Sequence, residues 1–297
     1  MTLPTFNPSP APGSPPLSML DIQGEFGGSA PISLSEYYSA ASGIPASGTI
    51  SIRNFYGTSA RKSIYLNINS PTYNYSVWSN ANSSGYVAGL SDIYVNVGPS
   101  VYVGSTNHDN YAMQVEYFNA ADTVRITNNG NIQGMGGTGG DDVFGSSNPS
   151  HPGTYGGNAL YLSVPTTVYN YGTIAGGGGG GGSSAGATPF KGPTRWGGAG
   201  GGGAGYAVGP GGADTGSGGP GSPGYLDSGG AGGTGYPGQV GGAGGGLGAA
   251  GAHGTNNSGN SPSTGGDGGA PGYYVVGYSY ANSGQGLGGT TYGPATG

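Results

Sequence analysis

The sequence predicts a mainly β and irregular protein in three successive parts. A small N-terminal docking segment with short helices is followed by a β domain, and then by a bundle of polyglycine type II helices framed by short strands. Two observations carry this prediction. Apolar and polar residues alternate over 63–128, and most of the 73 glycines among the 297 residues are gathered between 175 and 270. Alternation with a period of two is typical of strands, whereas long glycine runs have no side chains to bury.

The composition argues against several classes of protein. Charged residues make up 6% of the chain and the net charge is −6, which argues against a nucleic-acid partner. The chain has no cysteine, so disulfides and thiolate metal sites are ruled out. No apolar run approaches the roughly 18 residues of a membrane span. The N-terminus lacks the features of a signal peptide, so we expect synthesis in the cytoplasm of the producing cell.

Residues 1–17 form a segment rich in proline and serine. Proline suits neither a helix interior nor a central strand, so this segment is predicted to be an extended arm. Two alternatives stay open at this point, a frayed end and an arm that becomes ordered on a partner.

Short helices are predicted within residues 18–62. The first starts at Ser18 and ends near Gly27, the second starts with the capping box Ser33-Leu34-Ser35-Glu36, and the third starts at Ser51. Helices this short are unstable alone in water. They must therefore pack on the rest of the chain or on a partner.

The spaced motifs in 21–28, 32–38 and 47–57 resemble a short module that recurs in virion structural proteins of tailed bacteriophages. This resemblance implies attachment to other phage tail proteins rather than catalysis. The residues expected to serve attachment are Ile22, Phe26, Leu34, Tyr37, Tyr38, Phe55 and Tyr56.

A β domain is predicted over 63–135, because β-branched and aromatic residues recur there with a period of two. We expect it to be antiparallel, with the form of a sandwich or a prism. The pattern N-x-G-x-I-x-G occurs at 128–134 and at 170–176, with a looser copy at 282–288. These copies are interpreted as strand and turn rungs that frame the glycine region.

The glycine-rich region, 136–297, alternates glycine runs with segments that carry bulky and polar residues. Composition alone fits a disordered tail equally well. A division between runs and bulky segments instead favours extended helices with three residues per turn, whose outward N–H and C=O groups pair with neighbouring helices. Collagen is excluded because the glycines keep no strict G-x-y register.

No enzymatic site is predicted. Asp141-Asp142 with His151, and the adjacent pair His108-Asp109, are interpreted as polar residues of glycine- and serine-rich loops. Glu116 and Asp122 are the only carboxylates in the β domain considered for glycoside hydrolysis, which needs a pair about 5–10 Å apart. We expect no metal and no cofactor.

Residues 170–297 resemble, in architecture, the receptor-binding adhesins at the tips of long tail fibres in T-even-like phages. The resemblance implies a virion protein of the tail tip, made in the host cytoplasm, whose loops bind a host outer-membrane protein or surface glycan. It also implies a homotrimer or a cap on a trimeric fibre. The candidate receptor-binding residues, chosen as anchors in the loops, are Phe190, Lys191, Arg195, Trp196, Tyr206, Tyr225, Tyr236 and His253.

The alternation of glycine runs predicts which loops share an end. If each glycine run is a single helix, loops 183–196 and 234–240 are expected at one end, and loops 206–228 and 249–264 at the other. The alternative is a further helix over 209–221, which would shift this alternation. Two alternative functions stay open, a non-catalytic structural virion protein and an ice-binding glycine-rich bundle. Ice binding would require small residues repeated on one flat face.

Overall fold

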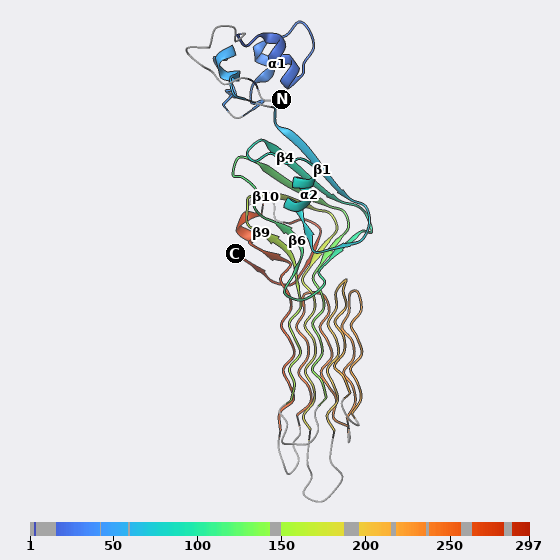
Figure 1. Cartoon of the computed structure of the whole chain (residues 1–297). Coiled ribbons are helices and arrows are strands. Elements are labelled where there is room, and N and C mark those ends of the chain that lie inside the picture. Colours follow the sequence, from blue (N-terminus) through green and yellow to red (C-terminus); the bar gives the residue numbers. More distant parts are fainter. Residues whose placement is uncertain are drawn as a thin grey trace, which may run out of the picture. The chain divides into compact units, whose positions relative to one another are not determined.

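The chain folds into two compact units in the computed structural model (Figure 1). The first unit comprises Met1–Ile64, Ala81–Ile93 and Phe118–Thr123, and the second comprises Tyr65–Asn80, Tyr94–Tyr117 and Val124–Gly297. The described residues are 3, 16–41, 43–58, 60–142, 150–186, 196–214, 218–235, 238–256, 263–281 and 287–297. None of the helices in these ranges has the length and hydrophobicity that a membrane crossing requires.

Three short helices of the first unit begin where the sequence predicts. They are α1 (Met19–Phe26), η1 (Leu34–Tyr37) and η2 (Ile52–Phe55), and their N-caps are Ser18, Ser33 and Ser51. In each, the N-cap amide donates to the side chain three residues later, namely Asp21, Glu36 and Asn54, at 2.8, 3.0 and 2.9 Å. The sequence predicted one capping box, and the structure has three. Helix α1 ends at Gly27, whose φ of 77° is unfavourable for other residues.

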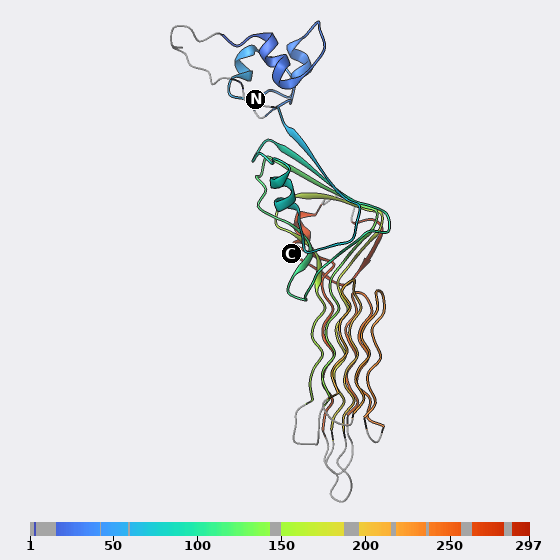
Figure 2. The same ribbon diagram turned by 45° about the vertical axis from the view of Figure 1, so that its right-hand side comes forward.

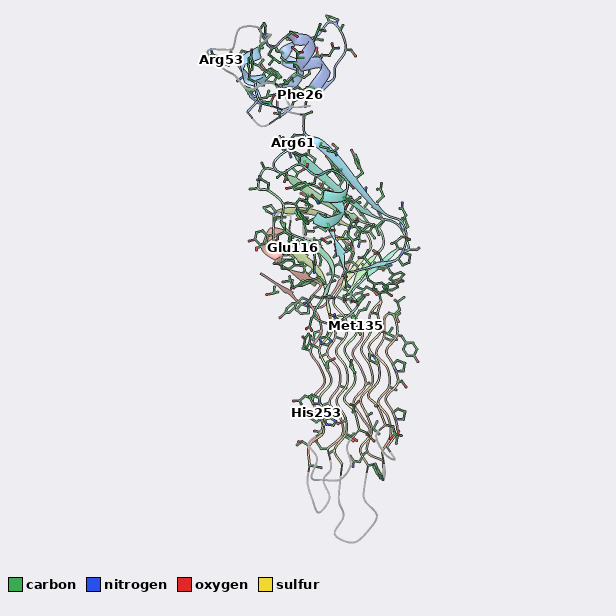
Figure 3. All side chains as sticks on the ribbon, viewed as in Figure 1. Phe26, Arg53, Arg61, Glu116, Met135 and His253 are labelled. Atoms are coloured by element: carbon green, nitrogen blue, oxygen red, sulfur yellow. The ribbon has the colours of Figure 1, made fainter. Side chains whose placement is uncertain are left out.

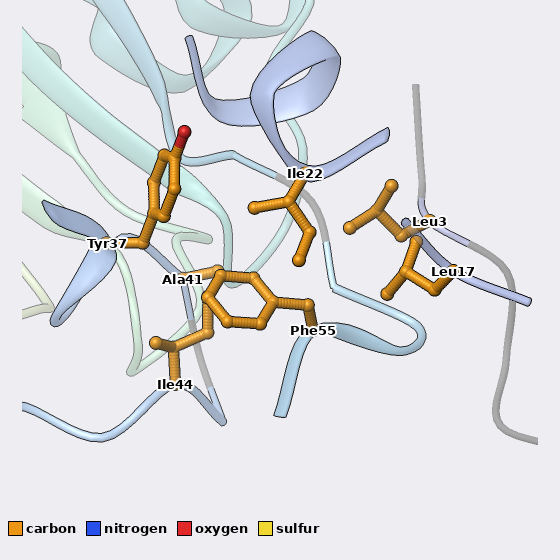
Figure 4. Close-up of a cluster of buried hydrophobic side chains, with 7 residues drawn as sticks. All are labelled: Leu3, Leu17, Ile22, Tyr37, Ala41, Ile44 and Phe55. Carbon is orange, nitrogen blue, oxygen red and sulfur yellow. The ribbon is translucent and has the colours of Figure 1, made fainter. Parts of the chain in front are cut away.

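The three helices pack on one another around a small apolar core (Figure 4). Ile22 and Phe55 are fully buried, and Phe55 makes edge-to-face contacts with Phe26 and Tyr37, each at 5.8 Å between ring centroids. Packing within the chain, rather than on a partner, therefore accounts for how these short helices are stabilised.

The segment 1–17 is not a free arm at its described residues. Leu3 and Leu17 are each only 5% exposed and belong to the same core. The Leu3 amide also donates to the Thr58 carbonyl at 2.9 Å. The beginning of the chain is thus anchored, whereas 4–15 lie outside the described residues.

The strands of the chain's described residues form three sheets. The first has the order β1 (Lys62–Ile68), β4 (Ser91–Val97), β7 (Thr123–Asn128), β10 (Thr166–Asn170). The second has the order β13 (Thr290–Tyr292), β11 (Thr173–Ala175), β8 (Asn131–Gln133), β5 (Tyr102–Gly104), β2 (Thr72–Tyr73). The third has the order β14 (Ala295–Thr296), β12 (Val275–Val276), β9 (Asn158–Leu162), β6 (Tyr111–Val115), β3 (Tyr75–Ser76). The other helices are α2 (Val77–Ser83) and η3 (Tyr278–Tyr280).

The strands form a β-helix with three sides, because successive strands enter the three sheets in turn. Pairing is parallel in the second and third sheets and between β7 and β10. The antiparallel prediction is therefore wrong. Alternation with a period of two shows only that one face of a strand is buried, and this holds equally for parallel and antiparallel strands.

The sequence repeat forms adjacent rungs of the β-helix. Asn128 and Asn170 are in register, as are Ile132 and Ile174. The buried amide of Asn128 donates from Nδ2 to Asn170 Oδ1 at 2.8 Å, which links the two rungs at their corner. The interpretation of the first two copies as rungs is confirmed. Most of the looser copy at 282–288 lies outside the described residues.

Both glycine-rich insertions leave the β-helix between the second and third sheets. One joins β8 to β9, and the other joins β11 to β12. In the first two rungs of the β-helix, the chain passes from the second sheet to the third through short connections, which are Asn74 and 105–110. Strands β9 to β14 thus belong to the same β-helix as the strands before residue 135, although the sequence assigned 136–297 to the glycine bundle.

The described residues of the insertions form ten extended glycine segments, which run side by side away from the strands (Figures 1 and 2). In chain order they are 134–142, 151–157, 176–186, 196–205, 207–213, 218–224, 229–235, 240–246, 249–256 and 265–272. Segments that follow one another run in opposite directions. For example, Gly209 and Gly212 donate to Gly203 and Gly200 in antiparallel order.

The hydrogen bonds of the central segment 176–186 have a period of three residues. Every third amide donates to the same neighbouring segment, at distances of 2.8–3.0 Å. The donors and their acceptors are Gly177, Gly180 and Ser183 to Gly157, Thr154 and His151; Gly178, Gly181 and Ser184 to Ala204, Gly201 and Gly198; and Gly179, Gly182 and Ala185 to Ala249, Ala252 and Thr255. Further segments donate to its carbonyls, so that it has six neighbours: 134–142, 151–157, 196–205, 240–246, 249–256 and 265–272.

Close approach between backbones explains why glycine occupies the central segment. A Cβ atom at Gly180 would lie 1.9 Å from the Thr138 carbonyl oxygen, and one at Gly181 would lie 2.0 Å from that of Gly242. Real Cβ atoms essentially never come this close to another heavy atom. Collagen requires glycine at its axis for the same steric reason.

Candidate functional site

The antiparallel order of the described glycine segments brings five pairs of segment ends to the end opposite the β-helix, which we call the loop end. The pairs are 142 and 151, 186 and 196, 213 and 218, 235 and 240, and 256 and 265, and a chain connection joins the two members of each pair. Most of their residues lie outside the described ranges. At the other end, which we call the β-helix end, each segment continues into a strand or into a short connection such as 225–228.

Polar side chains bond to the backbone where the segments approach the loop end. Ser183 Oγ accepts from the His151 amide at 2.8 Å, and Ser184 Oγ accepts from the Gly198 amide at 2.7 Å. Asp141 accepts in the same way from the Ala213 amide at 2.8 Å. These bonds satisfy amides at the edge of the hydrogen-bonded lattice. They hold the segment ends, and therefore the places from which the connections emerge.

Two of the candidate receptor-binding residues are described near the loop end. Trp196 begins segment 196–205 and is half-buried. His253 lies nearer the loop end than Met135 does (Figure 3), and its side chain is 43% exposed. His253 Nε2 is 3.4 Å from Asp267 Oδ1 on the adjacent segment. The other four candidates for this end, Phe190, Lys191, Arg195 and Tyr236, lie outside the described residues.

Tyr206 and Tyr225 lie at the β-helix end of the bundle instead. Tyr206 stacks between Tyr73 and Tyr102, with ring centroids 5.1 and 5.0 Å apart. Burial raises the pKa of the Tyr206 hydroxyl. The stack fits over Gly104, where a Cβ atom would lie 2.6 Å from the Tyr206 ring. Tyr206 thus joins the bundle to the β-helix, a structural role that was not predicted from the sequence, which marked Tyr206 only as a candidate receptor anchor.

Two of the loops expected from the sequence contain glycine segments. Loop 206–228 contains the segments 207–213 and 218–224, so the alternative of further glycine segments in this loop is the correct one. Residues 249–256, which the sequence assigned to a loop, form a glycine segment of their own. The following connection therefore lies at the loop end, together with those after 186 and 235. Alanine and histidine are accommodated in 249–256 because it lies at the flank of the bundle, where Ala250 and His253 are exposed.

Replacing Tyr206 by alanine is expected to lower the stability of the second unit by about 1–3 kcal/mol, since two aromatic contacts of about 0.5–1.5 kcal/mol each are lost. Thermal unfolding of the purified chain measures this change. Tyr225→Ala is the matched control, because Tyr225 is 59% exposed at the same end of the bundle. Equal melting temperatures for the two variants would contradict the role given to the stack.

Two of the polar residues considered for catalysis, His151 and Asp122, are held in structural contacts. His151 Nδ1 lies 3.2 Å from the backbone oxygen of Asp141, rather than from a carboxylate. Asp122 accepts from the Ser91 amide at 3.0 Å and from the Tyr86 hydroxyl at 2.5 Å. Within the described residues, no three histidine, aspartate or glutamate side chains are grouped as metal ligands would be.

The residues predicted to serve attachment are mostly part of the core of the first unit. Ile22, Tyr37 and Phe55 are buried, and Phe26, Leu34 and Tyr56 pack against them. The hydroxyl of Tyr38 donates to the Gly48 carbonyl. These residues therefore stabilise the fold of the first unit. Sequence reasoning missed Leu20, a large apolar side chain of α1 that is 74% exposed.

Comparison with protein families decides the identity. The family model for the phage tail fibre adhesin Gp38 matches residues 63–296, which contain the β-helix and the glycine segments. The chain belongs to this family. The adhesin is accordingly a component of the phage tail, and its family role is structural rather than catalytic. A search of curated proteins found no match.

A solved structure supports the fold. The adhesin is similar to a chain in the crystal structure of the gp37–gp38 adhesin tip complex of the bacteriophage S16 long tail fibre. The TM-score is 0.50 at 19% sequence identity, and the likeness covers 91% of the adhesin and 86% of the other chain. At this identity the likeness concerns the fold alone. The family match covers residues 63–296, and the structural likeness covers a larger share of the chain, 91%.

Proposed function

We propose that the adhesin binds a receptor on the host cell surface through the chain connections at its loop end. In this proposal the glycine segments are polyglycine type II helices. Their hydrogen bonds with a period of three residues support this assignment, as do the close backbone contacts of Gly180 and Gly181. The receptor is a host outer-membrane protein or a surface glycan, and the phage protein is made in the host cytoplasm.

The observation that carries the proposal is the gathering of five connections at one end of a scaffold held by its backbone. The lattice between segments needs almost no specific side chains, so the sequence of the connections is free to serve recognition. Recognition residues are often found in loops that a rigid scaffold holds in place. Aromatic and basic residues in or next to these connections, such as Arg195 and Trp196, are suited to anchor a receptor.

Attachment to the phage is assigned to the first unit. The solved structure similar to the adhesin is a complex of two tail fibre proteins, which supports a tail fibre protein as the partner. The exposed Leu20 on α1 is a candidate contact. Two forms of assembly are compatible with this proposal, a homotrimer and a cap on a trimeric fibre.

Trp196→Ala or Tyr236→Ala is expected to weaken binding to host cells about 30-fold or more, because truncating a central anchor costs about 2 kcal/mol or more. Adsorption of purified adhesin to cells, at matched protein stability, measures the loss. The control is Tyr225→Ala at the β-helix end, which should bind like the unmodified protein. Unchanged adsorption of both loop-end variants, with a loss for Tyr225→Ala, would place recognition at the other end.

A further inference from the structure

A continuous row of large side chains crosses the outward face of the first sheet. It comprises Tyr65 on β1, Tyr94 on β4, Arg125 on β7 and Tyr169 on β10. All four belong to the second unit. The rings of Tyr65 and Tyr94 are stacked, with centroids 5.0 Å apart and planes at 15°. The row is accessible, because Tyr65 is 62% exposed and Arg125 is exposed as well.

The guanidinium of Arg125 is held between two aromatic rings. Its Cζ lies 5.9 Å from the ring centroid of Tyr94 and 5.3 Å from that of Tyr169. Cation–π contacts of this kind orient the guanidinium and leave its N–H donors, which lie in the guanidinium plane, able to bond to a ligand. The side chain is therefore oriented before any ligand arrives.

Within the described part of the chain, Arg125 lacks the hydrogen-bonded partner that Arg61 and Lys62 have. Arg61 forms an ion pair with Asp92 at 2.8 Å, and Lys62 donates to the carbonyls of Ser84 and Gly85 at 3.0 and 2.9 Å. Arg125 has no hydrogen bond or ion pair with any residue that the structure describes. In a chain with a net charge of −6, this positive charge on an open sheet face has no ion-pair partner among the residues that the structure describes.

An amide ladder lies beside the row on the same face. Asn67 and Asn96 follow Tyr65 and Tyr94 by two residues, so they share the outward face of their strands. Asn96 Nδ2 donates to Asn67 Oδ1 at 2.9 Å, which fixes the orientation of both amides. The face thus offers oriented amides next to aromatic rings and one oriented guanidinium, which suits a ligand with hydroxyl groups and one negative charge.

We propose that this face binds an acidic glycan through the carboxylate of one of its sugars. The guanidinium fork matches a carboxylate geometrically, and the single positive charge matches the single charge of a carboxylate better than the roughly −2 of a phosphate monoester. The rings and the Asn67–Asn96 ladder contact the neighbouring sugar surfaces and hydroxyls. This site lies on the β-helix, so it is independent of receptor binding at the loop end.

Hexagalacturonate, a carboxylated oligosaccharide, is the probe, and its binding to the full chain is measured by calorimetry. Arg125→Gln is expected to weaken binding about tenfold or more, as for loss of a charge-assisted hydrogen bond. Arg125→Lys should be weakened similarly, because lysine keeps the charge but lacks the planar fork. Arg53→Gln, which removes an equal charge from the first unit, should bind like the unmodified protein, and all variants should melt alike.

Three results would overturn the proposal. They are the absence of hexagalacturonate binding to the unmodified protein, equal binding by Arg125→Gln, and equal binding of the methyl-esterified hexamer, which lacks the negative charges. Tighter binding of a phosphorylated oligosaccharide would overturn the assignment to a carboxylate. Host-cell adsorption through the loop end is expected to continue in Arg125→Gln, so failure here is distinguishable from failure of the receptor proposal.

Discussion

Gly181→Ala is expected to destabilise the second unit by about 3 kcal/mol or more, because a buried methyl group must be inserted between backbones. The new Cβ would lie 2.0 Å from the Gly242 carbonyl oxygen, so the two segments must separate. Separation also strains the bonds that join these two segments, from Gly242 to Gly182 and from Gly245 to Gly179, each at 2.8 Å. A loss of this size lowers the melting temperature by about 6–12 °C in a unit of this length. Thermal unfolding followed by circular dichroism measures it.

Gly246→Ala provides the matched control within the same bundle. A Cβ at Gly246 would have one neighbour within 4 Å, the Asp227 carbonyl oxygen at 3.3 Å. The expected change is therefore within about 1 kcal/mol. If Gly181→Ala melts at the same temperature as Gly246→Ala, the close packing of the central segment is refuted.

Phe55→Ala is expected to cost about 3–5 kcal/mol, the usual loss for removing a buried phenylalanine. Phe55 is fully buried and contacts both Phe26 and Tyr37, so its loss removes the centre of a small core. Cores of this size supply only about 3–5 kcal/mol, so we expect α1, η1 and η2 to unfold together. Limited proteolysis of the N-terminal residues should then become fast, while the second unit keeps its melting transition.

Incorporation into phage particles tests the consequence of that unfolding for attachment. Under the proposed attachment role, Phe55→Ala and deletion of 1–57 should both abolish incorporation, while the purified proteins still bind host cells. Leu20→Ala is the control for folding, because Leu20 is 74% exposed and its loss should leave resistance to proteolysis unchanged. Normal incorporation of the deletion variant would show that attachment lies elsewhere in the chain.

The sequence by itself determined the features that depend on neighbouring residues. Ser18, Ser33 and Ser51 cap helices because the groups they satisfy lie within three residues. The two copies of N-x-G-x-I-x-G revealed rungs, because repeated rungs place equal residues in register, as at Ile132 and Ile174. Glycine runs also predicted close backbone packing, because the absence of a side chain is a property of each residue by itself.

Only the tertiary structure decided how distant segments meet. Alternation with a period of two is identical in parallel and antiparallel strands, so the three-sided β-helix could not be predicted from it. Tyr206 looked like a loop anchor, and only its contacts with Tyr73 and Tyr102 place it at the β-helix end. The row through Arg125 forms only because four strands, which lie up to about a hundred residues apart in the chain, are neighbours in one sheet. The physical reason is common to all three: relative direction and register are set by hydrogen bonds between residues far apart in the chain, and no local pattern records them.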